Sequence, residues 1–430
     1  MRTFLLSVAG MTAVSCACSL WAIDLGFPDG IHVHRVAGSG LLVPVGDANA
    51  DGMDDLAKNN PRASPQTGSC LLAVYGALTH PPTRVVPAVG GQFCSNGNTD
   101  QELPMPRFSS SFCGAGSNSI VFGGNGYNDG QLHSMPKFGR VDFQTIFRNC
   151  GGGTLSKVGD MTGDGAEELW VGQGFGGRFL RSPCGPGVHQ CGPAVDVANA
   201  GGLAPTAVNL GDVGGSASPD VAFSSSNTVF ALFNMSHANL SEMTAAQGFR
   251  VSSALSGSVS AIVGNVDFNG DGLLDIGIGY GGASTSGLTS NGRVYVVYGR
   301  TGGFPFETDL DAPSPHVSRI DGIASQQSLG SRLAAPDFDD DGTDDIVISG
   351  DLGEAYVLFG QGERFENGPI STLVENAAVI RMPSPRAVDA VASGFDFNDD
   401  GREDLGLSFG NDYFVVFGRS NSLFSSSFEE

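Results

Sequence analysis

Short apolar runs recur along the chain, and each comes after a polar loop rich in Asp, Asn and Gly. The runs contain many β-branched and aromatic residues, which is typical of strands that are buried on both faces. The clearest runs are LLAVYG (71–76), VFALFN (229–234), VYVVYG (294–299), AYVLFG (355–360) and YFVVFG (413–418). The pattern therefore predicts an all-β chain of short strands joined by tight turns.

The polar loops share a nine-residue pattern, with oxygen-bearing side chains at places one, three, five and nine and Gly at place six. Four copies fit it fully: DANADGMDD (47–55), DFNGDGLLD (267–275), DFDDDGTDD (337–345) and DFNDDGRED (396–404). A fifth, DMTGDGAEE (160–168), has Thr at the third place and Glu at the ninth, and a sixth, DVGGSASPD (212–220), keeps only its first and last acids. A double-length interval leaves room for a shortened unit at CGAGSNSIVFGG (113–124), which makes seven units in all.

Seven units of roughly 60 residues each indicate a repeat architecture, since a single unit of this size cannot bury its own apolar faces. We expect a seven-bladed β-propeller with four-stranded blades and hairpin loops over residues 23–420. The segment IHVHRVA (31–37) is suitably placed to join the terminal unit, so that the ring closes without exposed sheet edges. Residues 421–430 are predicted to form a tail beyond the last blade.

The composition agrees with this architecture and limits the partners. The chain contains 64 Gly and 22 Pro, which favour tight turns, and its formal net charge is −23. A strongly acidic chain is a poor partner for nucleic acid or an anionic membrane surface, because like charges repel. Cations are better candidates, particularly since the acids gather in the spaced loops.

The N-terminus predicts export. Residues 1–22, MRTFLLSVAGMTAVSCACSLWA, have the basic start, apolar run and small final residue of a secretory signal peptide, and a lipid anchor at Cys16 or Cys18 is the alternative. No later segment reaches the length of a membrane span, so we expect a secreted or cell-surface monomer. Cys184 and Cys191 are the best candidates for a disulfide in an oxidising compartment, and buried free thiols are the other possibility.

The loops predict calcium sites. Calcium takes six to eight oxygen ligands in a flexible geometry, and Gly at the sixth place supplies the turn that folds the loop inward. A calcium-binding EF-hand does not fit, because that longer loop lies between helices and these loops lie between strand-like runs. The expected ligands, including the carbonyl of the seventh residue, are Asp47, Asn49, Asp51, Met53 and Asp55; Asp267, Asn269, Asp271, Leu273 and Asp275; Asp337, Asp339, Asp341, Thr343 and Asp345; and Asp396, Asn398, Asp400, Arg402 and Asp404. A fifth, weaker site would use Asp160, Thr162, Asp164, Ala166 and Glu168.

The order of loop, strands and Gly-rich segment resembles the FG-GAP repeats of the integrin α-chain propeller and their bacterial relatives. The resemblance spans about residues 25–420 and is most specific at 267–305 and 319–350. It implies adhesion to an extracellular protein or glycan through loops on one rim, with the calcium loops on the opposite side or the outer edge. The long inserts 90–112 and 181–206 are the first candidates for such a ligand surface.

Catalysis is not indicated by any motif. The seven His residues are scattered through the repeat, and no nucleophile elbow, zinc-protease pair or phosphate-binding loop occurs. We therefore expect a binding protein without catalytic residues. A propeller-based extracellular hydrolase or lyase acting on polysaccharide or phosphoester is the alternative, since abundant Asp and Glu could include a carboxylate pair.

Overall fold

The chain folds almost entirely into strands. The computed structural model describes residues 21–25, 33–37, 42–47, 51–64, 68–78, 83–85, 92–94, 106–110, 119–123, 132–136, 144–148, 154–163, 167–173, 176–180, 189–190, 203–233, 242–373 and 377–419. Within these residues the only helix is the short α1 (Ile370–Leu373), and no helix there is long and apolar enough to cross a membrane. The predicted all-β class is confirmed.

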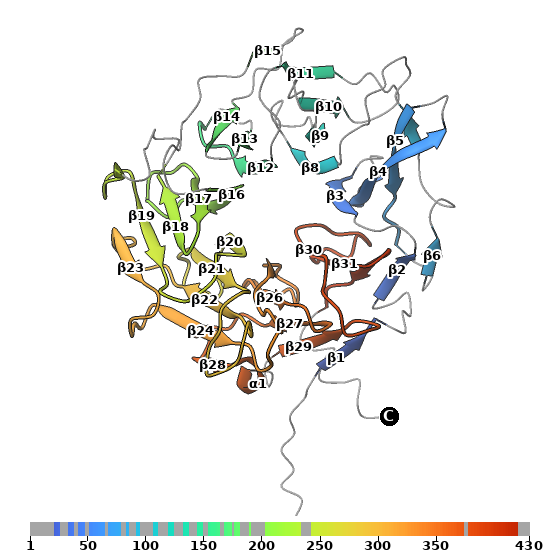
Figure 1. Ribbon diagram of the computed structural model, residues 1–430. Coiled ribbons are helices and arrows are strands. Elements are labelled where there is room, and N and C mark those ends of the chain that lie inside the picture. Colours follow the sequence, from blue (N-terminus) through green and yellow to red (C-terminus); the bar gives the residue numbers. More distant parts are fainter. Residues whose placement is uncertain are drawn as a thin grey trace, which may run out of the picture.

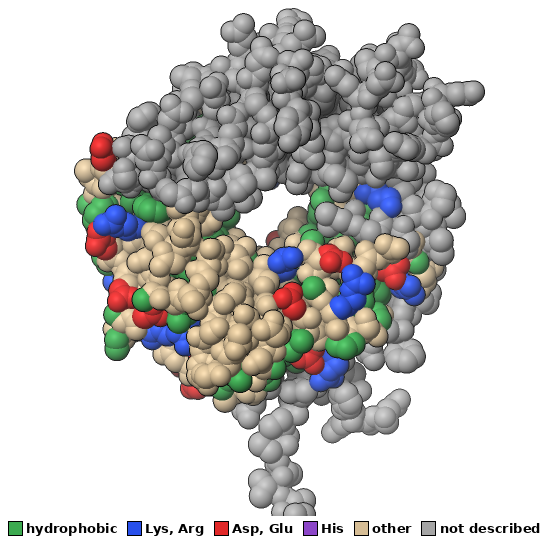
Figure 2. All heavy atoms as spheres, in the orientation of Figure 1, with side chains coloured by type: hydrophobic (Ala, Val, Ile, Leu, Met, Phe, Trp, Pro, Cys, Tyr) green, Lys and Arg blue, Asp and Glu red, His purple; other side chains and the backbone are tan. Residues whose placement is uncertain are grey.

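The described strands form seven sheets arranged around a central space (Figure 1). In the same orientation, Figure 2 shows an opening in the middle of the molecule. From the innermost strand outwards, sheet 1 is β3 (Val43–Gly46), β4 (Asp55–Ser64), β5 (Gly68–Val74) and β7 (Gln92–Cys94); sheet 2 is β8 (Pro106–Ser110), β9 (Ser119–Gly123), β10 (Leu132–Pro136), β11 (Gln144–Arg148) and β15 (His189–Gln190); and sheet 3 is β12 (Thr154–Gly159), β13 (Glu168–Gln173) and β14 (Gly176–Leu180).

The remaining four sheets follow in chain order. Sheet 4 is β16 (Leu203–Gly211), β17 (Asp220–Ser225), β18 (Thr228–Leu232), β19 (Gly248–Ser252) and β23 (Glu307–Asp309), and sheet 5 is β20 (Ala261–Val266), β21 (Asp275–Tyr280), β22 (Arg293–Val297), β24 (Val317–Asp321) and β28 (Gly368–Pro369). Sheet 6 is β25 (Arg332–Ala334), β26 (Ile346–Ser349), β27 (Glu354–Leu358), β29 (Ala377–Arg381) and β1 (Trp21–Asp24), and sheet 7 is β30 (Ala390–Ala392), β31 (Leu405–Phe409), β32 (Asp412–Val416), β2 (Val33–Ala37) and β6 (Thr83–Val85).

A short fifth strand lies at the outer edge of sheets 2, 4, 5, 6 and 7, parallel to its neighbour, whereas the preceding strands are antiparallel. In sheet 4 this strand is β23, which comes between β22 and β24 of sheet 5 in the chain but pairs with β19. Six of the seven sheets have the four antiparallel strands that the sequence predicts, and sheet 3 has three within the described residues. The fifth strands were not predicted, because segments of two to four residues carry no readable alternation.

The N-terminal segment closes the ring, as predicted. Strand β2 is antiparallel to β32, with Val36 opposite Tyr413, so the first and last parts of the chain share sheet 7. Strand β1 pairs with β29 of sheet 6, with Trp21 opposite Ala378. Trp21 and Ala22 belong to the predicted signal peptide, and their place in β1 adds a second contact across the closure that the sequence did not suggest.

The core lies between neighbouring sheets. One cluster joins sheets 6 and 7, and others join sheets 3 and 4, 4 and 5, 5 and 6, and 7 and 1. The second strands β17, β21 and β31 are buried at every position, which explains why their sequences are apolar or small on both faces. Face-to-face packing of sheets around an axis therefore holds the loops that join the first and second strands at fixed places in the ring.

Candidate metal centre

Each nine-residue loop connects the innermost strand of a sheet to the second strand. Loop 267–275 joins β20 to β21, loop 337–345 joins β25 to β26, and loop 396–404 joins β30 to β31. The ninth residue stands at or beside the start of the buried second strand, and the first eight residues leave the sheet as a compact turn. The repeat thus places the same set of polar side chains beside every sheet that carries the pattern.

The first-place Asp holds the turn by accepting two backbone hydrogen bonds. In loop 267–275 the carboxylate of Asp267 accepts the N–H of Asp271 at 3.2 Å and of Gly272 at 2.7 Å. Asp47, Asp337 and Asp396 accept the equivalent pair in their own loops. These bonds are made within the loop, between the first Asp and the main chain of the glycine turn.

The ninth-place Asp links the loop to the end of the third strand. Asp275 is fully buried; its carboxylate accepts the N–H of Phe268 at 2.9 Å and of Gly299 at 2.8 Å. Asp345 and Asp404 make the same two kinds of bond. Burial is the main cause that raises the pKa of Asp275 to about 7 and of Asp404 to about 8, and it also raises the pKa of Asp345.

The glycine that ends each apolar run has a structural reason. A Cβ on Gly299 would lie 2.7 Å from the carbonyl oxygen of Leu274, and one on Gly360 would lie 2.3 Å from that of Asp344. Only a residue without a side chain lets the loop pack this closely on the third strand. The glycines of the Tyr-Gly and Phe-Gly pairs are therefore needed for the close packing of the acidic loops on the third strand.

The third-place side chain is different, because its oxygen is buried without a hydrogen-bond partner. Both carboxylate oxygens of Asp339 are in this condition, and the side chain is only 1% exposed. The amide oxygens of Asn269 and Asn398 also lack a partner. Buried polar atoms are almost always paired, so these four oxygens, on three side chains at equivalent places, are available to a cation or an ordered water.

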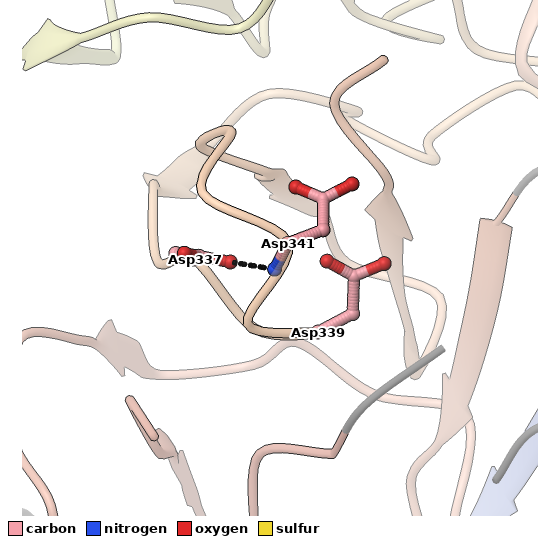
Figure 3. A group of neighbouring side chains, drawn as sticks. All are labelled: Asp337, Asp339 and Asp341. Carbon is pink, nitrogen blue, oxygen red and sulfur yellow. Dashed lines mark hydrogen bonds between the residues drawn. The ribbon is translucent and has the colours of Figure 1, made fainter. Parts of the chain in front are cut away.

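Loop 337–345 gathers three carboxylates around that point (Figure 3). Asp337, Asp339 and Asp341 can each offer an oxygen within 4.8 Å of the others. Burial, together with the charges of Asp341 and Asp337, raises the pKa of Asp339 to about 6. Among the described residues this is the one group of at least three His, Cys, Asp or Glu side chains close enough to share a metal ion.

The other predicted ligands are placed as follows. The seventh residues Met53, Leu273, Thr343 and Arg402 each donate their N–H to the fifth-place carboxylate of their own loop, namely Asp51, Asp271, Asp341 and Asp400. Asp55 accepts the N–H of Gly76. Asn49, Asp164 and Ala166 lie outside the described residues, as do the predicted Cys184 and Cys191 pair and most of the inserts 90–112 and 181–206.

The two divergent loops fold in a related way but use their side chains differently. In loop 160–168 the buried Glu168 accepts the N–H of Met161 and Thr162 and also the hydroxyl of Thr162 at 2.9 Å. In loop 212–220 Asp212 accepts the N–H of Ser216 and Ala217, with no acid at the third or fifth place. The third-place group of these loops is thus already bonded or missing.

Sequence reasoning overlooked the eighth place. Asp344 accepts the N–H of Asp267 in the preceding sheet, and Asp54 accepts that of Asp396. The signal was available, because loops 47–55, 337–345 and 396–404 all carry an acid there. The nine-residue pattern assigned ligand roles to the side chains at places one, three, five and nine, and it assigned none to the acid at the eighth place.

Comparison with known proteins agrees with the repeat. Residues 261–297, which run from β20 through loop 267–275 to the end of β22, match the family model of the FG-GAP repeat. The chain therefore contains an FG-GAP repeat, and the resemblance recognised from the motifs is confirmed.

Relatives and a solved structure extend the likeness. The chain is 34% identical over 123 residues to phosphatidylinositol-glycan-specific phospholipase D of Rattus norvegicus, a match that covers 26% of this chain and 14% of that protein. With the Homo sapiens protein of the same name it shares 33% over 106 residues, or 12% of that protein. The crystal structure of BBS1N in complex with ARL6DN, soaked with mercury, aligns over 91% of this chain and 94% of its own, with a TM-score of 0.51 and 10% identity. That likeness shows the fold alone.

Proposed function

We propose that the chain is a seven-bladed β-propeller that binds calcium in loops 47–55, 267–275, 337–345 and 396–404, with a weaker site in loop 160–168. The observation that carries the proposal is the buried, partnerless carboxylate of Asp339 beside Asp337 and Asp341. An isolated buried carboxylate is costly, and a cation that accepts its lone pairs removes that cost. The blade count rests on the seven sheets of the described strands.

Calcium fits the donor set better than the other common cations. The loops offer oxygen only, which disfavours zinc, and they are short flexible turns, whereas magnesium demands a near-ideal octahedron. Loop 337–345 has Asp at places one, three and five and should bind most tightly, because affinity rises with ligand charge. Loop 160–168 is expected to be weaker, since its third place offers the hydroxyl of Thr162 in place of a carboxylate or amide oxygen.

Equilibrium dialysis and thermal melting of the full chain would test calcium binding. We expect about four ions to bind at millimolar calcium and the melting temperature to fall in EGTA, because a ligand at 100 times its Kd stabilises by about 2.7 kcal/mol per site. Magnesium at the same concentration serves as the comparison. An unchanged melting temperature in millimolar EGTA, with no calcium retained on dialysis, would show that the loops are polar turns only.

The second part of the proposal concerns the purpose of the ring. FG-GAP content and the phospholipase relatives favour an extracellular or surface protein, and the predicted signal peptide agrees with export. In Figure 2 charged side chains lie along the outer edge of sheets 4 and 5, whereas the described surface nearer the middle of the molecule is mostly neutral. Such a neutral area suits an uncharged ligand such as a glycan or a neutral protein surface. We propose a calcium-stabilised scaffold that binds such a ligand.

A glycan and matrix-protein array, run in calcium and in EGTA, separates the two functional classes. Calcium-dependent retention of a ligand supports the scaffold. Turnover of a polysaccharide or phosphoester without retention would instead support the hydrolase or lyase alternative. The phospholipase activity in the relatives' name belongs to those proteins, because the matched segment is a small part of their length.

A further inference from the structure

Two pairs of loops in neighbouring sheets are joined by the same reciprocal contact. Asp344, at the eighth place of loop 337–345, accepts the N–H of Asp267 with Oδ2 at 2.6 Å and donates its own N–H to the carbonyl oxygen of Asp267 at 3.1 Å. Asp54 makes the same two bonds with Asp396, at 3.0 Å and 2.9 Å. The first pair joins sheets 5 and 6, and the second joins sheets 7 and 1 across the closure of the ring.

The contact reaches the proposed ligands of both loops. Asp267 is the first-place ligand whose carboxylate holds the turn of its own loop. Asp344 stands between Thr343 and Asp345, the seventh and ninth places of the next loop. A Cβ on Gly270 would lie 3.5 Å from Thr343 Oγ1, so the two loops also touch at their tips. These contacts therefore link the conformation of one loop to the main chain of the other.

Other junctions show that the ring can be built without this bond. At the junction of sheets 4 and 5 the eighth place is Leu274, whose side chain packs where a Cβ on Gly211 would lie. In loop 396–404 the eighth place is Glu403, which accepts the N–H of Gly394 in its own sheet at 3.2 Å. Among the described residues the carboxylate bridge occurs at two junctions, and both loops of each bridged pair carry the full nine-residue pattern.

We propose that Asp344 and Asp54 are positioning residues that couple cation binding between neighbouring loops, 267–275 with 337–345 and 396–404 with 47–55. The proposal rests on the calcium binding proposed above, and the unpartnered oxygens of Asn269 and Asp339 support it at the first pair. A cation in loop 337–345 orders Asp344, which fixes the main chain at Asp267, so the second loop loses less conformational freedom on binding. Coupling of this kind is reciprocal.

The test uses the full chain with only the first pair of loops active. Asp51→Ala, Asp160→Ala and Asp400→Ala disable the other sites, and calcium binding is followed by titration calorimetry. We expect two bound ions with a Hill coefficient above 1. Disabling loop 337–345 with Asp341→Ala should then weaken binding at loop 267–275 by about fivefold or more, within the usual range of coupling.

The positioning residue is then changed in that background. With Asp344→Ala, two ions should still bind, and Asp341→Ala should alter the affinity of the remaining loop by less than about twofold, below the usual range of coupling. Asp344→Asn keeps an oxygen acceptor without the charge and should keep the coupling. Asp351→Ala removes an exposed acid beyond the far end of β26 and controls for the loss of charge.

Three results would overturn the proposal. Equal coupling with Ala and Asp at position 344, while two ions bind, would show that the bridge is structural only. Equal loss of coupling in the Ala and Asn variants would assign the effect to charge. Absence of calcium binding in the starting background would refute the proposed function as well as the coupling. Should Asp344→Ala fail to fold, the same cycle is run with Asp54→Ala in the reciprocal background, where loops 47–55 and 396–404 are intact and loops 267–275 and 337–345 are disabled, and it decides the question.

Discussion

Asp339→Asn and Asn269→Asp, two reciprocal substitutions at the third place of neighbouring loops, should have opposite effects on the stability of the metal-free protein and on its response to calcium. Asp339 is buried and unpartnered, whereas the same place holds Asn269 in loop 267–275, where the amide donates to Asp271 at 3.0 Å. Asp339→Asn replaces a buried charge with a group that the neighbouring loop already accommodates. The metal-free protein should therefore become more stable, and the calcium response should become smaller because one ligand charge is lost.

The magnitude follows from the raised pKa of Asp339, about 6 in the folded protein against an ordinary value of 3.8. A carboxyl whose pKa is raised by folding lowers stability progressively as the pH rises from the unfolded pKa to the folded pKa, and the loss is complete above the folded value. At pH 8 the effect is at most about 3 kcal/mol, because solvent screening of the three neighbouring carboxylates reduces it. For a chain of this size that corresponds to roughly 3 to 6 °C in melting temperature. Asn269→Asp is the reciprocal change and should destabilise the metal-free protein while enlarging the calcium response.

The assay is thermal melting at pH 8 of both variants and the natural sequence, in EGTA and in millimolar calcium. Asp212→Asn is the matched control, because loop 212–220 lacks acids at the third and fifth places and its two backbone bonds should weaken equally in both conditions. A folded Asp339→Asn variant whose melting temperature in EGTA is unchanged or lower would refute the reasoning. It would mean that the carboxylate is already satisfied without a cation.

Three further predictions follow from the structure. Burial raises the pKa of Asp404 to about 8, so the protein in EGTA should lose stability as the pH rises from 4 to 8. Thermal melts in calcium should show much less of this loss. A higher melting temperature in EGTA at pH 8 than at pH 5 would contradict the prediction. Val36→Asp puts a charge into the core between sheets 7 and 1, so it should lower the free energy of unfolding by more than about 3 kcal/mol and make the chain sensitive to protease. The control Arg35→Ala, in the same strand, should lower it by less than about 1 kcal/mol. Equal protease resistance of the two variants would argue against closure by β2. Gly292→Ala should lower the midpoint of urea unfolding at least twice as much as Gly303→Ala. Both glycines have a positive φ, but only at Gly292 would a Cβ meet a carbonyl oxygen, that of Leu329 at 2.2 Å. Equal shifts of the two midpoints would refute the steric reasoning.

Much of the loop construction is local and was readable from the sequence. The first-place Asp and the glycine at place six act within five residues of each other, so their spacing alone predicts the turn that Asp267 and Gly272 form. The buried runs were equally readable, since β22, β27 and β32 lie where the apolar residues are densest. The place of β2, which lies within the predicted segment 31–37, in the last sheet followed from the need to pair both edges of the ring.

What the sequence could not supply depends on residues brought together from distant places. Nine residues show five candidate oxygens but do not reveal that Asp275 is bonded to Phe268 and Gly299, while the amide oxygen of Asn269 is left without a partner. That distinction needs the third strand in position beside the loop. It separates the oxygens that hold the fold from those that can receive a cation.

The sequence by itself determined the repeat, the all-β class and the turn of each acidic loop, because these depend on residue types a few positions apart. Only the tertiary structure decided that β23 pairs with β19 of the preceding sheet and that β1 pairs with β29 of sheet 6. It also decided that Asp344 meets Asp267 and that Asp54 meets Asp396, 342 residues away in the chain. The physical reason is that such contacts form only when neighbouring sheets pack and set one loop beside the next, and between Asp54 and Asp396 only when the ring closes.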